Sequence, residues 1–187
     1  AEIPEELHET TWCGEMTREM LAGVAKTERP FFLFSSYWKP HPPFEVPNPW
    51  ATMYDKMDID LPSPETEESI KRYPEPVQKM ILRADRPAFK FSRQELLWMH
   101  RAYYGAVSQV DEQVGKTLAF LDELGLKDNT LVIYTSDHGE FLGEHGLLEK
   151  NLLYEGAIRV PLFIRYPEVV TPGTYSELFE ATDFLAT

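Results

Sequence analysis

The chain has 187 residues, of which 43% are hydrophobic and 13% aromatic, a composition typical of one globular domain with a real core. Its formal net charge of −13 argues against nucleic acid as a partner, because proteins that bind DNA or RNA carry a basic face. No apolar run reaches the length of about eighteen residues that a membrane span needs, and the single cysteine excludes an internal disulfide.

The first predicted element is an amphipathic helix over residues 9–26, in which apolar side chains recur at helical spacing. Thr10 or Thr11 is expected to cap its first turn. The apolar run Phe31–Tyr37 predicts a buried strand that ends in a Pro-rich loop.

Residues 44–91 are predicted to be irregular. Seven prolines fall between Pro47 and Pro87, which excludes a long helix or a central strand. Two short helices are expected, near residues 65–73 and 76–83. The stretch is too long for a simple connection in a compact domain and is interpreted as a functional excursion.

Residues 92–124 carry the strongest helix pattern in the chain. Ser92 followed three residues later by Glu95 is a capping-box signature, and Gly125 stands where a helix commonly ends. The apolar, β-branched run at residues 131–134 then predicts a buried strand.

The C-terminal part adds a strand at residues 160–166 and a last helix at residues 175–187. The order of strand, excursion, helix and strand is typical of a right-handed crossover between parallel strands. The predicted fold class is therefore α/β, with a mostly parallel sheet flanked by helices and an irregular Pro-rich excursion.

Asp137 and His138 follow the strand at residues 131–134 directly. Open α/β sheets place ligands at the carboxyl ends of their strands, and a carboxylate and an imidazole can both bind a metal. The motif Asp-His-Gly is also common in plain turns, so on these three residues alone a metal site and a turn both stay open.

Three further side chains gain meaning only in combination. Alone, His41 is interpreted as a surface-loop histidine and Lys150 as a solvated lysine. Lys39 lies two residues before His41, after the same predicted strand. If the strand before His41 and the strand before Asp137 are parallel neighbours, their loops meet at one edge of the sheet. Cationic and proton-bearing groups opposite a metal would then suit a tetrahedral oxyanion.

The motifs together resemble the sulfatase family of the alkaline-phosphatase superfamily. The resemblance runs through PFFLFSSYWKPHPPF at residues 30–44 and through nearly all of residues 102–167, including LVIYTSDHGEFLGEHGLLEK. The Asp-His pair followed by LGEHG is similar to the iduronate-sulfatase-like and bacterial glycan-sulfatase branches. It implies a partial alkaline-phosphatase-like fold and hydrolysis of sulfate esters, with a sulfated small molecule or glycan as the substrate.

The resemblance also implies roles for individual residues. Asp137 and His138 would bind a divalent metal, usually Ca²⁺, while the nitrogen ligand leaves Mn²⁺ open. His41 would contact the ester near its bridging oxygen, and Lys150 would hold sulfate oxygens and assist the leaving group. Lys39 would add a substrate contact.

The chain departs from the family pattern in its first part. The family carries its nucleophile in a C-x-[PA]-x-R motif, where the cysteine or serine becomes formylglycine, and a pair of metal-binding aspartates near its N-terminus. Neither is present. Cys13 lacks this context and is interpreted as a packing residue of the first helix. Residues 1–187 are therefore interpreted as the second part of one catalytic domain, predicted to be inactive alone.

Several expectations depend on that interpretation. Surface uncovered by the missing half could support a homo-oligomer. The resemblance favours a periplasmic, secreted or lysosomal location, with the cytoplasm open. Two other functions remain: a phosphonate monoester or phosphodiester hydrolase of the same superfamily, and a non-catalytic binding module that keeps the fold.

Overall fold

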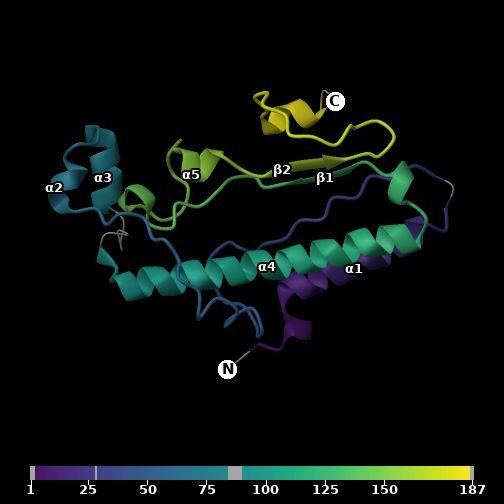
Figure 1. The fold of residues 1–187 in the computed structure, drawn as a ribbon, viewed down its shortest axis with the longest axis horizontal. Helices are drawn as coiled ribbons and strands as arrows, with labels where there is room; N and C mark the ends of the chain where they lie inside the picture. Colours follow the sequence, from purple (N-terminus) through teal and green to yellow (C-terminus); the bar gives the residue numbers. More distant parts are fainter. Residues whose placement is uncertain (1–2, 28, 84–89, 186–187) are drawn as a thin grey trace. The chain divides into compact units, whose positions relative to one another are not determined.

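The computed structural model describes residues 3–27, 29–83 and 90–185 (Figure 1). The chain divides into two compact units, which are taken in turn. The first unit comprises Ala1–Lys127 and Phe141–Leu148, and the second comprises Asp128–Glu140 and Glu149–Thr187. Within the described ranges, no helix combines the length and the apolar character that crossing a membrane requires.

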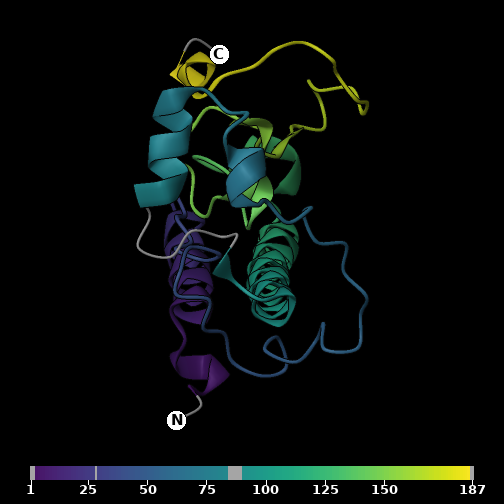
Figure 2. The same ribbon diagram turned by 90° about the vertical axis from the view of Figure 1, so that its left-hand side faces the viewer.

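The first unit is built on two long helices that lie side by side, α1 and α4 (Figures 1 and 2). Its other helices are short. The elements are the 3-10 helix η1 at Glu5–Leu7, α1 at Glu9–Val24, α2 at Glu67–Ile70, α3 at Glu75–Arg83, α4 at Arg93–Glu123 and the 3-10 turn η4 at Glu144–Gly146. The prediction of a helix at residues 9–26, of two short helices in the Pro-rich region and of a long helix at residues 92–124 is confirmed.

The capping box predicted for α4 is present. The Ser92 hydroxyl accepts a hydrogen bond from the Glu95 amide at 3.2 Å, and the Glu95 carboxylate accepts one from the Ser92 amide at 2.8 Å. These bonds satisfy two polar groups that every helix start leaves open. Gly125 has a φ of 69°, the left-handed conformation that ends a helix and that glycine adopts without strain.

The prediction of the residue that caps α1 is wrong. His8, and neither Thr10 nor Thr11, is the N-cap, and its Nδ1 atom accepts a hydrogen bond from the Thr10 amide at 3.3 Å. Because α1 begins at Glu9, the residue before it is the cap, and both threonines lie inside the first turn, where they are buried. The amide of Gln109 on α4 contacts the Thr11 hydroxyl at 3.5 Å.

Residues Phe31–Tyr37 form no strand, contrary to the prediction. A strand exists only where its backbone groups pair with a neighbour, and no such ladder includes these residues in the described part of the chain. Phe32 and Phe34 are 90% and 78% exposed, so the run is not buried on two faces. Tyr37 is half-buried, and this burial raises the pKa of its hydroxyl.

The second unit contains one small sheet. Its elements are β1 at Val132–Thr135, α5 at Glu155–Ile158, β2 at Leu162–Arg165 and the 3-10 helix η5 at Ala181–Leu185; the 3-10 turn η3 at Lys127–Asn129 stands at its border. The two predicted strands near residues 131–134 and 160–166 are confirmed. They pair antiparallel, with Tyr134 opposite Phe163 and their ring centroids 6.1 Å apart.

The α/β class therefore holds, but the expected parallel pairing is absent among the described residues. The sheet there has two strands, and the connection from Thr135 to Leu162 reverses the chain direction. The parallel partner was expected at residues 31–37, which form no ladder. As a consequence alternate side chains of β1 are only half-buried, and Ile133 between them stays 43% exposed.

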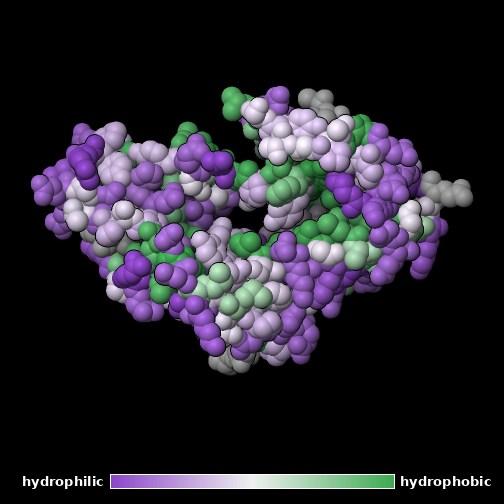
Figure 3. All heavy atoms as spheres, viewed as in Figure 1, coloured by the Kyte–Doolittle hydropathy of each residue, from purple (hydrophilic) through white to green (hydrophobic). Residues whose placement is uncertain are grey.

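The helix predicted at residues 175–187 is also wrong for the described part. Only the short 3-10 helix η5 forms, and residues 174–180 are exposed and not helical. A short helix owes its stability to an apolar face packed on a partner. Leu178 has no such partner and is fully exposed. Figure 3 shows that apolar side chains reach the surface of the molecule in several places.

Candidate metal and anion site

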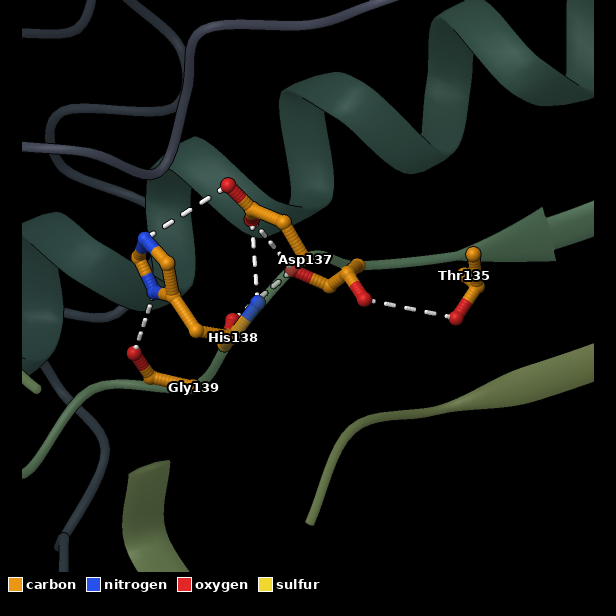
Figure 4. Close-up of polar contacts among 5 residues, drawn as sticks. Thr135, Asp137, His138 and Gly139 are labelled. Atoms are coloured by element: carbon orange, nitrogen blue, oxygen red, sulfur yellow. Dashed lines mark hydrogen bonds and ion pairs between the residues drawn. The ribbon is translucent and has the colours of Figure 1, made fainter. Parts of the chain in front are cut away.

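The turn after β1 holds the predicted metal-binding pair. The Asp137 carboxylate and the His138 ring point toward each other, with Oδ2 of Asp137 3.5 Å from Nε2 of His138 (Figure 4). The other carboxylate oxygen, Oδ1, accepts a hydrogen bond from the His138 amide at 3.0 Å. The side chain of Asp137 is 84% exposed and that of His138 is 36% exposed, so solvent ions reach both.

The His138 ring has a defined orientation. Its Nδ1 atom lies 2.9 Å from the carbonyl oxygen of Gly139. A carbonyl can only accept, so this contact is a hydrogen bond when Nδ1 carries the proton. The lone pair is then on Nε2, the atom that faces Asp137, which is the usual arrangement of a metal-binding histidine.

Gly139 fixes the turn against helix α5. Its amide donates to the carbonyl of Ala157 at 2.7 Å, and a Cβ atom at position 139 would overlap the backbone of Gly156. Only glycine allows this approach of two backbones. The close packing explains why the Asp-His pair is followed by glycine at this point of the sequence.

The pair suits a divalent cation but makes only part of a site. Two donors bound to one cation at about 2.1–2.4 Å lie about 3–3.5 Å apart, and the Oδ2 to Nε2 separation of 3.5 Å falls at the upper end of that range. Among the described residues, no group of three or more His, Cys, Asp or Glu side chains gathers in a way that could hold a metal. Asp137 and His138 would therefore share a cation with donors from elsewhere.

Lys150 lies in the same unit as this pair. It is half-buried, and the residue before it is held in place, because the Glu149 amide donates to the carboxylate of Glu140. Glu140 is only two residues beyond His138. The hydrogen bond therefore returns the chain to the neighbourhood of the turn after β1 just before Lys150.

His41 lies in the first unit, in a loop that its own backbone tightens. The His41 amide donates to the carbonyl of Trp38 at 3.1 Å, and the two rings are in contact with centroids 4.8 Å apart. The Nδ1 atom lies 2.7 Å from the carbonyl oxygen of Pro42. The expected convergence of His41 with Asp137 and His138 joins two different units and stays a prediction.

Lys39 is 5% exposed and is bound within the first unit. Its ammonium donates to the Pro43 carbonyl at 2.6 Å and lies 3.5 Å from the carboxylate of Glu9. These contacts give Lys39 a structural task, closing the loop around His41 onto helix α1. The predicted substrate contact of Lys39 stays a prediction.

Cys13 behaves as an ordinary helix residue. It is half-buried in α1, and its sulfur donates to the carbonyl of Ser36 at 3.3 Å. This contact ties α1 to the apolar run at residues 31–37.

Sequence reasoning missed a polar cluster in the first unit. The Tyr73 hydroxyl donates to Glu65 at 2.5 Å and lies 3.1 Å from Nδ1 of His145, while Ser69 donates to the second oxygen of Glu65. Burial of the Glu65 carboxyl raises its pKa, but the bonds from Ser69 and Tyr73 and the charges of Arg72 and His145 outweigh burial, and the net pKa is lowered. A histidine between two glycines, in Gly143–Gly146, was the available signal.

Comparisons with known proteins identify the family. The sulfatase family model matches residues 8–187. A multifunctional alkaline phosphatase superfamily protein of Trinickia caryophylli is 34% identical over 87% of this chain, and an arylsulfatase of Clostridium perfringens is 32% identical over 98% of it. An N-acetylglucosamine-6-O-sulfatase of Bacteroides thetaiotaomicron is 46% identical over 46% of the chain and 16% of its own length.

The fold agrees with this result. A phosphonate monoester hydrolase of Silicibacter pomeroyi superposes with a TM-score of 0.78 at 28% identity, over 88% of this chain and 34% of its own. The first two of these matches cover 33% and 38% of the relatives' own length, so the chain spans about a third of the curated proteins it matches. The expected partial alkaline-phosphatase-like fold is confirmed. The chain belongs to the sulfatase family, as its motifs predicted.

Proposed function

We propose that the whole protein is a sulfuric ester hydrolase and that residues 1–187 supply part of its catalytic site. The observation that carries the proposal is the Asp137–His138 pair, whose donor atoms lie 3.5 Å apart at the end of β1 and face each other as metal ligands do. Membership of the sulfatase family supports it.

Asp137 and His138 would hold the metal in this site. The Gly139 carbonyl keeps the His138 ring oriented, so its Nε2 lone pair stays directed toward the carboxylate. A bound divalent cation, Ca²⁺ or Mn²⁺, would polarise the sulfate oxygens and lower the pKa of the nucleophile. The mixed oxygen and nitrogen donors leave the choice between these ions to experiment.

His41 and Lys150 would act on the leaving oxygen. Negative charge develops there in the transition state, so a fixed ammonium or a proton donor stabilises the transition state more than the substrate. The backbone contacts of His41 hold its ring in a tight loop. Lys39, whose ammonium closes that loop, would add a contact to the substrate.

The nucleophile would come from outside this sequence. A formylglycine requires a cysteine or serine in a C-x-[PA]-x-R context, and the sequence has none. Residues 1–187 alone would therefore be inactive. Exposed apolar side chains such as Phe32 and Phe34 would favour self-association of the isolated chain.

We further propose a sulfated carbohydrate as the substrate. The support is the relative named an N-acetylglucosamine-6-O-sulfatase, which is 46% identical over its matched part. A phosphonate monoester or phosphodiester hydrolase is the second candidate, favoured by the superposition with the phosphonate monoester hydrolase. Sulfate monoesters, phosphonate monoesters and phosphodiesters are all tetrahedral monoanions, so the same metal-binding pair suits each of them.

The test uses the whole protein, purified with Ca²⁺ or Mn²⁺. It is assayed on 4-nitrophenyl sulfate, on the 4-nitrophenyl ester of phenylphosphonate and on bis(4-nitrophenyl) phosphate. The proposal expects the sulfate ester to give the highest kcat/KM, with activity lost to a chelator and restored by metal. Faster cleavage of either phosphorus ester would favour the second candidate, and binding of a sulfated glycan without hydrolysis of any ester would indicate a binding module.

A further inference from the structure

Residues Phe141–Leu148, here called the connecting loop, separate the turn after β1 from Lys150. The loop packs within the first unit, whereas Glu140 and Glu149 at its two ends belong to the second. The hydrogen bond from the Glu149 amide to Glu140 closes the loop at its base. Lys150 is the residue after Glu149, so the conformation of the connecting loop constrains where Lys150 lies.

The backbone of the connecting loop adopts conformations of high energy. Leu142 and His145 have φ values of 46° and 56°, in the left-handed region that side chains with a Cβ atom rarely adopt. Gly143 and Gly146 are left-handed as well. Such conformations persist only where surrounding contacts impose them, and they concentrate at functional sites.

Apolar packing holds one part of the loop. Phe141 is 1% exposed and Leu147 is 7% exposed, so both side chains are core residues of the first unit. The amide of Gly143 donates to the carbonyl of Leu147 at 2.8 Å across the loop. These contacts fix the two ends of the loop, and the Phe141 ring also meets the ring of the strained residue His145 edge to face, with centroids 6.4 Å apart.

Tyr73 holds the centre of the loop. Because its proton is donated to Glu65, its oxygen can accept the Nδ1–H of His145, which lies 3.1 Å away. The two rings meet edge to face with centroids 5.9 Å apart. A Cβ atom on Gly146 would come within 3.3 Å of the Cβ atom of Glu65, so the carboxylate arm of the cluster also lies against the loop.

We propose that Tyr73 is a positioning residue: by joining Glu65 to His145, it keeps the connecting loop in its left-handed course and so sets the place of Lys150 relative to the turn after β1. The inference rests on the proposed function, because Lys150 matters to catalysis only if it acts on the ester. In this role Tyr73 acts through the loop and does not contact the substrate itself.

The first experiment needs no activity. Amide hydrogen exchange and the rate of Lys150 acetylation by acetic anhydride are measured by mass spectrometry on the whole protein, wild type against Tyr73→Phe. Loss of the hydroxyl should speed exchange in residues 141–148 about five- to tenfold and change the acetylation rate of Lys150. The phenyl ring preserves packing, so exchange in α4 should stay unchanged.

A matched control removes a tyrosine hydroxyl elsewhere in the same unit. Tyr54 donates or accepts one hydrogen bond with Ser108 on α4 at 2.8 Å. Tyr54→Phe should leave both the exchange of residues 141–148 and the acetylation of Lys150 as in the wild type. Equal values in the wild type and Tyr73→Phe would overturn the proposal, whether or not the protein is a sulfatase.

The second experiment links the loop to catalysis through the leaving group. A displaced ammonium matters most for a poor leaving group, so in Tyr73→Phe kcat should fall about tenfold on an alkyl or sugar sulfate and less on 4-nitrophenyl sulfate, with KM little changed. An equal fall on both esters would indicate lost folded protein and would overturn the positioning role. If the wild type cleaves no sulfate ester, the proposed function fails, and the exchange and acetylation results alone decide the role of Tyr73.

Discussion

The Nε2 atom of His138 faces the Oδ2 atom of Asp137 at 3.5 Å, while the opposite ring nitrogen rests on the Gly139 carbonyl. When Nδ1 carries the proton, its hydrogen bond to Gly139 leaves Nε2 available to a metal and fixes the direction of that nitrogen. Asp137 is exposed and His138 half-buried, and in the described part of the chain no third His, Cys, Asp or Glu side chain joins them in a metal site. This geometry makes the affinity for a divalent metal the first property to measure.

Asp137→Asn should weaken the affinity for the metal about tenfold to a hundredfold, because the carboxylate supplies a negative charge that the amide does not. Binding is measured on the whole protein by calorimetry with Ca²⁺ and with Mn²⁺. The exposed Asp128, also in the second unit, provides the control: Asp128→Asn makes the same chemical change and should leave binding as it is.

His138→Asn should change which metal the protein prefers. Replacing a nitrogen donor with an oxygen donor favours the harder cation, so the ratio of Ca²⁺ to Mn²⁺ affinity should rise. Calorimetry of the variant with both ions gives this ratio. An unchanged ratio would mean that His138 does not bind the cation.

Gly139→Ala should destabilise the protein by about 1–3 kcal/mol, because the new Cβ atom overlaps the backbone of Gly156 and neither backbone can move without strain. The midpoint of urea unfolding reports the loss. Gly115→Ala is the matched control. Apart from its chain neighbours and the backbone of its own helix, nothing lies within 4 Å of a Cβ atom there, and the residue is an exposed position of α4, so alanine should stabilise by about 0.5–1 kcal/mol.

The lowered pKa of Glu65 predicts a defined pH dependence. Its pKa in the folded state lies below the ordinary value of 4.5, so the unfolded state binds the proton more readily. The stability contributed by Glu65 is present above that value and is lost as the pH falls through the folded pKa. Glu65→Gln should lower the melting temperature at pH 7 and make its fall between about pH 5 and pH 3 shallower.

Glu67→Gln provides the comparison for that experiment. Glu67 is an exposed residue in the first turn of α2, two positions from Glu65. Its substitution should leave the slope of melting temperature against pH close to that of the wild type. Identical slopes for Glu65→Gln and the wild type would contradict a stabilising role of the ionised Glu65.

The sequence predicted the elements whose stability is local. In helix α4, Ser92 and Glu95 form the capping box and Gly125 ends the helix, as the sequence predicted. Strand pairing was not predictable in the same way. The run Phe31–Tyr37 has strand composition, but a strand needs a partner, and the sequence does not state which partner a run will have.

The same contrast holds for the candidate site. Asp137 and His138 are adjacent in the sequence, so their pairing followed from a short motif. The cluster of Glu65, Tyr73 and His145 joins residues up to 80 positions apart. Neither charge nor spacing marks such a contact, and only the left-handed turn implied by the two glycines around His145 gave a hint.

A substitution of Lys39 can distinguish a structural role of this residue from a contact with the substrate. Its ammonium is buried against the Pro43 carbonyl and Glu9, so removing the charge leaves a carbonyl without its donor. Lys39→Met keeps much of the side-chain volume and should lower the free energy of unfolding by about 1–3 kcal/mol.

If the lysine only closes the loop around His41, kcat for the folded enzyme should fall while KM stays constant. If it also touches the ester, KM should rise for sulfate esters. Steady-state kinetics on the whole protein, corrected for the folded fraction from unfolding curves, distinguish the two roles, and an unchanged unfolding midpoint would exclude the structural one.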